Sequence, residues 1–324
     1  MKRQLGSSDI QVTPITMGAW AIGGFMWGGN EEKDSIEAIE AYIDHGVTSI
    51  DTAPIYGFGY SEELVGKAIK NYDRSKLQIL TKFGMIWDAE KGDFAFEGKD
   101  NHGQLRKVYR YGGYETALRD VEASLKRLQT DYIDLIQLHW PDTTTPIDET
   151  MRAMEKMMQD GKVKAVGVCN YNAAQLKEAE QTIKLQSNQV PYSMLKRDIE
   201  TAVVPYAIEN NLSIIAYSPM ERGLLTGKYQ SSDALAADDH RTNYFKRFDF
   251  DKVATLTDKL AALAAEYQAT TAQLVLAWTF HQPAVAAALA GARNAKQAAE
   301  NAKAMDIQLK PEDLARIGEW IDTI

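Results

Sequence analysis

The sequence predicts a closed (β/α)8 barrel, in which eight parallel strands alternate with helices along the chain. Short apolar runs and helical patterns alternate through all 324 residues, with no change of composition that would mark a domain boundary. An open, doubly wound sheet is the alternative, but it normally has fewer strands and a GxGxxG turn after the first one. Residues 18–29 are rich in glycine but lack that spacing. We therefore expect one α/β TIM-barrel domain spanning residues 1–324.

Each predicted strand is a short, mostly apolar run. The strands are expected at residues 15–18, 48–51, 77–82, 133–139, 163–168, 187–190, 213–217 and 285–290. Helices have apolar residues at three- and four-residue spacings, and are expected at residues 33–45, 61–71, 114–128, 147–160, 173–183, 201–210, 250–267, 271–281 and 295–305. A β-hairpin is predicted ahead of the barrel in residues 1–13, and an additional C-terminal helix in residues 311–324.

Three connections are longer than the few residues usual in such units, namely residues 19–32, 83–113 and 218–249. Each follows a strand, so all three are expected at the C-terminal face of the barrel, where loops build active sites. They are unusually aromatic, with Trp20, Phe25, Trp27, Trp87, Phe94, Phe96 and Tyr109. These side chains predict a pocket for a small organic molecule, although they could also pack on one another as small cores.

Composition excludes several classes of function. The net charge of −9 argues against nucleic-acid binding, which needs clustered Lys and Arg. No apolar run is long enough to cross a bilayer, and the basic N-terminus lacks the apolar core of a signal peptide. Cys169 is the only cysteine, and no His, Asp and Glu spacing resembles a metal site. We expect a cytoplasmic enzyme with no bound metal.

Charged and polar residues end the second, third and fourth predicted strands, at Asp51, Lys82 and His139. An acid and a lysine at inward strand ends are costly to bury unless they pair with each other. Tyr56 lies in the turn-rich loop after Asp51. A nearby Lys82 cation would lower the pKa of Tyr56 from about 10 toward neutrality. Tyr56 could then protonate a carbonyl oxygen as a hydride arrives at its carbon, with His139 orienting that oxygen.

Several motifs make the chain resemble the aldo-keto reductase superfamily over essentially its whole length. The stretch around the acid and tyrosine reads DTAPIYGFGYSEELVGKAI at residues 51–69. The others are TKFG at 81–84, DYIDLIQLHWPD at 131–142, GVCNY at 167–171, YSPMERGLLTGKY at 217–229 and GARNAKQAAEN at 291–301. WAIGG at 20–24 resembles the branch near the potassium-channel β-subunits and the bacterial general-stress reductases.

The resemblance implies NADPH-dependent, reversible reduction of an aldehyde or ketone, with a catalytic tetrad of Asp51, Tyr56, Lys82 and His139. The alternative for these four residues is a merely structural ion pair beside a packed aromatic ring. The resemblance also implies residues that contact the cofactor: Gly18, Trp20, Asp51, Asn170, Gln189, Tyr217, Ser218, Met220, Gly223, Leu224, Lys228, Gly291, Arg293, Gln297, Glu300 and Asn301.

Within that set, Tyr217 is expected to stack on the nicotinamide, and Asn170 and Gln189 to hydrogen-bond its carboxamide. Arg293 suits a 2′-phosphate, which favours NADP(H) over NAD(H). Two departures from the family pattern bear on these contacts. Cys169 stands where the family most often has Ser, and residues 295–296 are Ala and Lys where relatives often have a proline and an acid.

The substrate is expected to be a small or medium carbonyl compound held by Trp20, Trp27, Trp87 and Trp140. The basic, polar residues 99–110 favour a hydroxylated substrate, such as a sugar aldehyde. One alternative function is a nicotinamide-cofactor-sensing interaction protein with vestigial catalysis, like the channel β-subunits. A phosphate-binding barrel lyase or isomerase is another, and it would bind no nicotinamide. The oligomeric state stays open.

Overall fold

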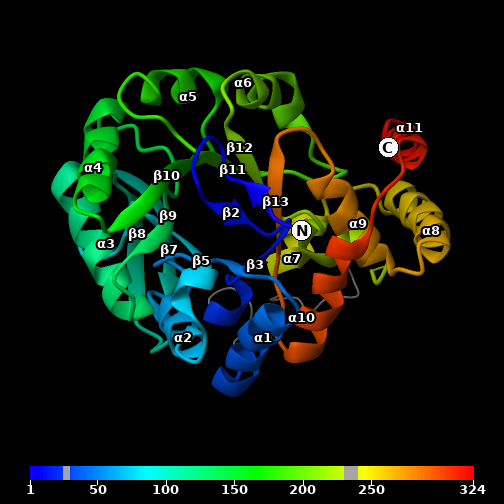
Figure 1. The fold of residues 1–324 in the computed structure, drawn as a ribbon, viewed down its shortest axis with the longest axis horizontal. Helices are drawn as coiled ribbons and strands as arrows, with labels where there is room; N and C mark the ends of the chain where they lie inside the picture. Colours follow the sequence, from blue (N-terminus) through cyan, green and yellow to red (C-terminus); the bar gives the residue numbers. More distant parts are fainter. Residues whose placement is uncertain (25–29, 230–239) are drawn as a thin grey trace.

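The computed structural model describes residues 1–24, 30–229 and 240–324 and confirms the predicted barrel. Parallel strands close a barrel in the order β10–β11–β12–β13–β3–β4–β5–β9, with helices arranged around it (Figure 1). The barrel strands are β3 (Ile15–Gly18), β4 (Ser49–Asp51), β5 (Gln78–Phe83), β9 (Ile133–Leu138), β10 (Val163–Cys169), β11 (Ser187–Pro191), β12 (Ser213–Tyr217) and β13 (Val285–Ala290). These strands are almost wholly buried, as expected for a parallel sheet covered by helices.

The helices follow the predicted order, with shorter ends in places, except that α7 (His240–Phe245) lies in the connection at residues 218–249 and was not predicted. They are α1 (Glu32–Asp44), α2 (Tyr60–Ile69), α3 (Tyr114–Leu128), α4 (Ile147–Gln159), α5 (Ala173–Ala179), α6 (Val203–Glu209), α7 (His240–Phe245), α8 (Phe250–Glu266), α9 (Thr271–Phe280), α10 (Ala295–Ala302) and α11 (Pro311–Ile321). The helix predicted at residues 295–305 is α-helical only to Ala302, and its remaining residues form a 3-10 turn, Lys303–Asp306. The additional C-terminal helix, α11, packs on α8 outside the ring (Figure 1).

Local sequence explains where two of these helices begin. Asn172 and Gln175 form a reciprocal capping box at the start of α5, and Thr270 and Gln273 form another at the start of α9. Each box satisfies backbone N–H groups that have no partner within the helix. Helix α9 is apolar on every side and is buried from residue 273 to residue 280, so its packing, and not an amphipathic pattern, fixes its place.

The predicted N-terminal hairpin is present as β1 (Arg3–Gln4) paired antiparallel with β2 (Gln11–Val12). Its side chains Leu5, Ile10 and Val12 pack against inward residues of the barrel strands, among them Leu80 and Leu135. Figure 1 shows the hairpin drawn across the middle of the barrel. The hairpin therefore closes the N-terminal end of the barrel with apolar side chains and leaves the other end for the long connections.

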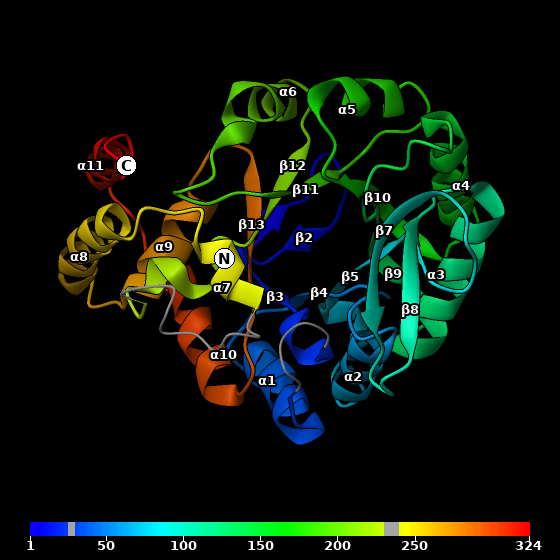
Figure 2. The same cartoon turned by 180° about the vertical axis from the view of Figure 1, so that it is seen from behind.

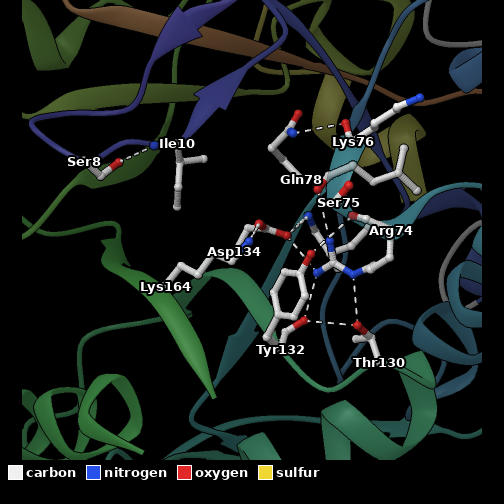
Figure 3. Close-up of polar contacts among 12 residues, drawn as sticks. Ser8, Ile10, Arg74, Ser75, Lys76, Gln78, Thr130, Tyr132, Asp134 and Lys164 are labelled. Atoms are coloured by element: carbon white, nitrogen blue, oxygen red, sulfur yellow. Dashed lines mark hydrogen bonds and ion pairs between the residues drawn. The ribbon is translucent and has the colours of Figure 1, made fainter. Parts of the chain in front are cut away.

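A charged cluster around the buried Asp134 joins three neighbouring strands at the N-terminal end of the barrel (Figure 3). Asp134 of β9 accepts hydrogen bonds from Arg74 Nη2 at 2.7 Å, from the Ile79 backbone N at 2.9 Å and from Lys164 Nζ at 3.2 Å. The Tyr132 ring lies between the two cations, 4.1 Å from Arg74 Cζ and 3.8 Å from Lys164 Nζ. Because these groups come from the segments around β5, β9 and β10, the cluster stabilises their register.

The connection at residues 83–113 was expected as a loop, and that expectation is wrong. It forms a three-stranded antiparallel sheet of β6 (Met85–Ile86), β7 (Asp93–Lys99) and β8 (Leu105–Arg110), in the order β6–β8–β7. Figure 2 shows β7 and β8 running next to each other in front of the barrel strands. Alternating side chains of β7 and β8 are partly covered. The backbone N–H and C=O groups of the segment are paired in this sheet.

Helices within the described ranges include none that is long and apolar enough to cross a membrane.

Candidate active site

The predicted ion pair lies at the C-terminal ends of two neighbouring barrel strands. Lys82 Nζ of β5 donates hydrogen bonds to Asp51 Oδ2 of β4 at 2.6 Å and to the Thr52 carbonyl at 2.9 Å. Both charged side chains are at most 1% exposed. Burial alone would lower the pKa of Lys82, but the charge of Asp51 raises it above its usual range and keeps the amine protonated.

The second carboxylate oxygen of Asp51 also accepts hydrogen bonds, from side chains of two other barrel strands. Gln189 Nε2 of β11 donates to Asp51 Oδ1 at 2.8 Å, and Gln137 Nε2 of β9 lies 3.4 Å from the same atom. A buried charge pair is stable only when its remaining donors and acceptors have partners. The two glutamines therefore complete the environment of Asp51 and fix its orientation toward Lys82.

Tyr56 stands beside this pair, in the loop after β4. Lys82 Nζ lies 5.0 Å from the centre of the tyrosine ring. The loop is held close to the loop after β3, since a Cβ at Gly57, where φ is +68°, would lie 2.2 Å from the Gly23 carbonyl oxygen. Glycine is therefore required next to the tyrosine, because any side chain would force the two loops apart.

The predicted direction of the Tyr56 pKa is wrong for the protein without ligand. Burial raises the pKa of Tyr56 to about 12, and the Lys82 cation lowers it by less than burial raises it. The effect of Lys82 has the expected sign, but desolvation of the phenolate is larger. Tyr56 is consequently protonated at neutral pH, which is the form that a proton donor needs.

His139 follows β9 and faces Tyr56 edge-on, with ring centres 5.7 Å apart and planes at 81°. Burial, together with the Lys82 charge, holds the pKa of His139 well below its usual value, so the imidazole is neutral. Its Nδ1 atom is buried and has no hydrogen-bond partner within the described structure. A buried polar atom without a partner is costly, and His139 also lines the cavity described next.

A single cavity of about 620 Å³ opens over these residues. Asp51, Tyr56 and His139 line it, while Lys82 lies behind them. Most of the predicted ligand-contacting residues line the same cavity: Gly18, Trp20, Trp140, Asn170, Gln189, Tyr217, Ser218, Met220, Gly223, Lys228, Gly291, Arg293, Gln297, Glu300 and Asn301. Residues far apart in the sequence are thus brought to one surface by the closure of the barrel.

Two predicted contacts within the described residues, Leu224 and Trp87, do not line this cavity. Leu224 is fully buried in a cluster with Phe245 and Val253 and does not line it. Trp87 also lies away from the lining, with its ring edge-on to Phe58 at 5.4 Å, as the alternative of a small aromatic core anticipated. Trp27 lies outside the described residues.

The residues expected at the nicotinamide form a connected group. Tyr217 OH donates to Asn170 Oδ1 at 3.0 Å, and Asn170 Nδ2 donates to the His139 carbonyl at 3.2 Å. Asn170 has a φ of 61°, a left-handed conformation that asparagine tolerates better than most residues. Burial raises the pKa of the neighbouring Cys169 thiol, so this cysteine is an uncharged, buried group.

At the far end of the cavity, several predicted residues also hold the backbone in place. Gln297 Oε1 accepts from the Arg293 backbone N at 2.9 Å. Asn301 Nδ2 donates to the Gly291 carbonyl at 3.1 Å and to Tyr42 OH at 2.8 Å. These bonds fix the segment between β13 and α10, which carries the Arg293 side chain.

Phe96, one of the loop aromatic residues expected to form a pocket, lines the cavity. Sequence reasoning missed several other residues that line it: Ile55, Met85, Arg222, Thr226, Tyr229, Arg241 and Gln273. Arg222 lies within the quoted YSPMERGLLTGKY stretch, so the motif could have pointed to it. Arg241 belongs to no quoted motif, and its Nη1 donates to Tyr229 OH at 2.7 Å. Phe96 comes from β7, in the segment that was expected to be a loop. Throughout the described ranges, no group of His, Cys, Asp and Glu side chains could hold a metal ion.

Comparison with known proteins gives the family of the chain. A sequence model of the aldo/keto reductase family matches residues 14–322, and the chain belongs to that family. It is 39% identical over 297 residues to the aldo-keto reductase YhdN of Bacillus subtilis strain 168, covering 90% of this chain and 85% of the relative. It is 33% identical over 328 residues to the NADH-specific methylglyoxal reductase of Escherichia coli K12, covering 100% and 99% of the two chains.

Solved structures agree with this assignment. A glycerol dehydrogenase, AKR11B4, from Gluconobacter oxydans superposes with a TM-score of 0.89 and 34% identity, covering 99% of this chain and 95% of the other. An aldo/keto reductase from Klebsiella pneumoniae, solved in complex with NADP and acetate, superposes with a TM-score of 0.71 and 29% identity, covering 95% and 91%. The barrel with its surrounding helices is therefore shared with enzymes of this family.

Proposed function

We propose that this protein is an NADP-dependent oxidoreductase that reversibly reduces an aldehyde or ketone to an alcohol. The observation that carries the proposal is the buried Lys82–Asp51 pair beside Tyr56, at the bottom of a cavity of about 620 Å³. A reduced nicotinamide bound in this cavity would supply the hydride. The fit of the cavity to such a group is supported by the unpartnered His139 Nδ1 and by the basic side chains farther along it.

The roles of the four residues follow from their charges. Tyr56 is protonated, so it can donate its phenolic proton to the carbonyl oxygen as negative charge develops there. Neutral His139 can hydrogen-bond the same oxygen and hold it next to Tyr56. Lys82 stabilises the phenolate that remains after proton transfer, and Asp51 holds Lys82 in place. In the reverse direction, the phenolate takes the proton of the alcohol.

The preference for NADP(H) is supported by the charges that line the cavity. The cations are Arg222, Lys228, Arg241 and Arg293, while Asp51 is neutralised by Lys82 and Glu300 is the other acid. This basic lining stands out in a chain with a net charge of −9. A pyrophosphate together with a 2′-phosphate would match it. One relative is NADH-specific by name, so the preference needs a direct measurement.

The substrate end supports an apolar carbonyl compound. Ile55, Met85, Phe96 and Trp140 line the cavity, with Trp20 next to Tyr56 at 6.2 Å between ring centres. The expectation of a hydroxylated substrate rested on residues 99–110, and none of these described residues lines the cavity. We therefore favour an aliphatic or aromatic aldehyde or ketone over a sugar aldehyde.

The single domain and the cytoplasmic location stay predictions.

The test is the loss of NADPH absorbance with a panel of aldehydes and ketones that ranges from glyceraldehyde to benzaldehyde. Turnover of apolar aldehydes with NADPH, and slower turnover with NADH, is the expected result. Tight NADPH binding in calorimetry without turnover of any carbonyl compound would instead favour a cofactor-sensing protein. Absence of nicotinamide binding would contradict both interpretations.

A further inference from the structure

An ion pair between α2 and α3 has no part in the proposed mechanism. Arg127 Nε of α3 donates a hydrogen bond to Glu62 Oε2 of α2 at 2.6 Å. The Glu62 side chain is fully buried, and the Arg127 side chain is 21% exposed. Such a pair adds little to stability by itself, because burying a carboxylate is costly. Further contacts of the pair reach two segments that carry tetrad residues.

The second carboxylate oxygen of Glu62 binds the strand that carries Lys82. Thr81 Oγ1 of β5 donates to Glu62 Oε1 at 2.7 Å, and both residues are completely buried. Successive side chains of a strand point to opposite faces, so Thr81 faces α2 while Lys82 faces the interior of the barrel. Glu62 therefore fixes β5 one residue before the lysine whose charge acts on Tyr56.

The Arg127 side chain packs against the loop that carries Tyr56, here called the Tyr56 loop (residues 52–59). Gly59 ends this loop with a φ of +103°, and a Cβ there would lie 2.8 Å from Arg127 Cδ. The Gly59 backbone N also donates to the Pro54 carbonyl at 2.6 Å, so the loop is closed on itself around Tyr56. The arginine that binds Glu62 thus supports the end of the Tyr56 loop.

The first turn of α2 binds the same loop through hydroxyl groups. Ser61 Oγ donates to the Ala19 carbonyl at 2.9 Å and lies 2.9 Å from Thr52 Oγ1. Because the Ser61 proton is given to Ala19, Thr52 is the donor in the second bond. The Thr52 carbonyl in turn accepts from Lys82 Nζ at 2.9 Å. The start of α2 therefore contacts both the Tyr56 loop and the partner of Lys82.

We propose that the Glu62–Arg127 ion pair is a positioning pair that sets the distance between the Lys82 cation and the Tyr56 ring. Neither Glu62 nor Arg127 lines the cavity, so the pair acts through other residues. This inference rests on the proposed function, because the distance affects turnover only if Tyr56 is the proton donor. The interaction of two charges depends strongly on their separation where water does not screen it.

The pair acts through position and not through its own charges. Burial raises the pKa of Tyr56, the Lys82 charge lowers it, and Asp51 and Cys169 raise it. His139 and Tyr217 also lie near Tyr56 and are uncharged, since burial lowers the pKa of the first and raises that of the second. The pair is therefore expected to alter the proton equilibrium of Tyr56 only by moving the tyrosine relative to Lys82.

The test is kcat against pH for benzyl alcohol oxidation with NADP+, in wild-type protein and in Glu62→Gln. This change keeps the shape of the side chain but removes the charge that Arg127 and Thr81 contact. We expect kcat to fall about 10-fold, because small displacements of catalytic groups are costly. The rate should also begin to rise at higher pH, since a phenolate farther from Lys82 is less stabilised.

Cofactor binding separates this role from a contact with the ligand. NADPH affinity of Glu62→Gln, measured by fluorescence titration, should stay within about twofold of the wild type, because the pair does not line the cavity. Arg127→Met should behave like Glu62→Gln. Arg127→Lys keeps a cation for Glu62 without the planar guanidinium, so it should restore part of the rate and of the pH profile. If Glu62→Gln does not fold, the two Arg127 variants decide.

Asp134→Asn is the matched control, because the Arg74–Asp134 pair has a similar exposure, 19% and 5%, at the opposite end of the barrel. It also replaces a carboxylate by an amide in a pair of helix-side and strand residues. Its melting temperature should fall to a similar extent, while its pH profile should equal that of the wild type. A structural role of the Glu62–Arg127 pair would give the same result in Glu62→Gln.

Three outcomes would overturn the inference while leaving the proposed function intact. The first is a folded Glu62→Gln protein with the kcat and pH profile of the wild type. The second is a reduced kcat with an unchanged pH profile, which would make the pair a general support of the fold. The third is an equal shift of the profile in Asp134→Asn. Wild-type protein that neither oxidises alcohols nor reduces carbonyl compounds would overturn the proposed function and this inference together.

Discussion

Lys82 and Asp51 form an ion pair that is almost completely withdrawn from solvent, with Nζ and Oδ2 2.6 Å apart. Such a pair contributes little to stability by itself, because the cost of desolvating two charges offsets their attraction. The pair instead places a permanent positive charge 5.0 Å from the Tyr56 ring, in surroundings that water does not screen. That charge acts on the proton equilibrium of the tyrosine, and the predictions for catalysis begin from it.

Removing the Tyr56 hydroxyl should abolish turnover and leave cofactor binding intact. Tyr56→Phe keeps the ring beside His139 but has no proton to donate, so we expect kcat to fall by at least about 10²- to 10⁴-fold. NADPH affinity, measured by fluorescence titration, should stay within about twofold, since the lost group is a proton donor and not a cofactor anchor. Tyr72→Phe is the matched control. Tyr72 OH donates a hydrogen bond to Asp44 Oδ1 at 3.0 Å, and Tyr72 does not line the cavity. An active Tyr56→Phe enzyme would refute the proposed mechanism.

Neutralising Lys82 should shift the pH dependence of alcohol oxidation toward alkaline pH. The Lys82 charge lowers the pKa of Tyr56 against the larger effect of burial, so Lys82→Met should raise that pKa further. Oxidation needs the phenolate, and its rate should therefore begin to rise at higher pH than in the wild type. The profile of kcat against pH measures the shift. An unchanged profile in folded Lys82→Met would show that another group titrates. The control is Lys67→Met, because Lys67 is an exposed residue of α2.

The charged cluster at the opposite end of the barrel should affect stability and not catalysis. Asp134→Asn leaves Arg74 and Lys164 without their shared carboxylate, which is 5% exposed. We expect the free energy of unfolding to fall by roughly 2 kcal/mol, less than for a fully buried pair, because Arg74 and Lys164 are 19% and 48% exposed. Denaturant unfolding measures it, and kcat at low temperature should be unchanged.

The control for this prediction is Asp198→Asn, which breaks a pair with Lys196 whose side chains are 79% and 41% exposed. It should alter the free energy of unfolding by less than about 1 kcal/mol. Equal effects of the two variants would contradict the assignment of Asp134 to strand register.

Much of the barrel was predictable because apolar strand runs and helical spacing repeat regularly, and the ends of those strands located Asp51, Lys82 and His139. The β6–β7–β8 sheet was missed because most side chains of β7 and β8, such as Phe94 and Arg106, stay partly or largely exposed, and in these two strands only Val108 is buried. Such strands lack the apolar run of a buried one. Arg222 was missed because its direction depends on a left-handed backbone that the sequence does not reveal. The Tyr56 pKa was misjudged because burial, the larger effect, depends on the closed fold.

Phe96 distinguishes the substrate end most directly, because the same strand provides its own control. Phe96 of β7 lines the cavity, whereas Phe94, two residues earlier, is 58% exposed and lies against Tyr109. The hairpin tip is fastened to the active-site loops by Asn101 Nδ2, which lies 3.4 Å from both the Gly23 and Gly57 carbonyls. These contacts hold the hairpin that carries Phe96 next to the cavity.

Phe96→Ser should raise KM for benzaldehyde about 10-fold, because an aromatic face that the substrate would cover is lost. KM for glyceraldehyde should change less than about twofold, since a hydroxylated substrate gains little from that face. Phe94→Ser should leave both values unchanged, and melting curves of the two variants show whether the hairpin stays folded. If Phe96→Ser weakens both substrates equally, the side chain shapes the active site without selecting for apolar carbonyl compounds. An effect of Phe94→Ser equal to that of Phe96→Ser would instead mean that the whole hairpin, and not its inward face, determines KM.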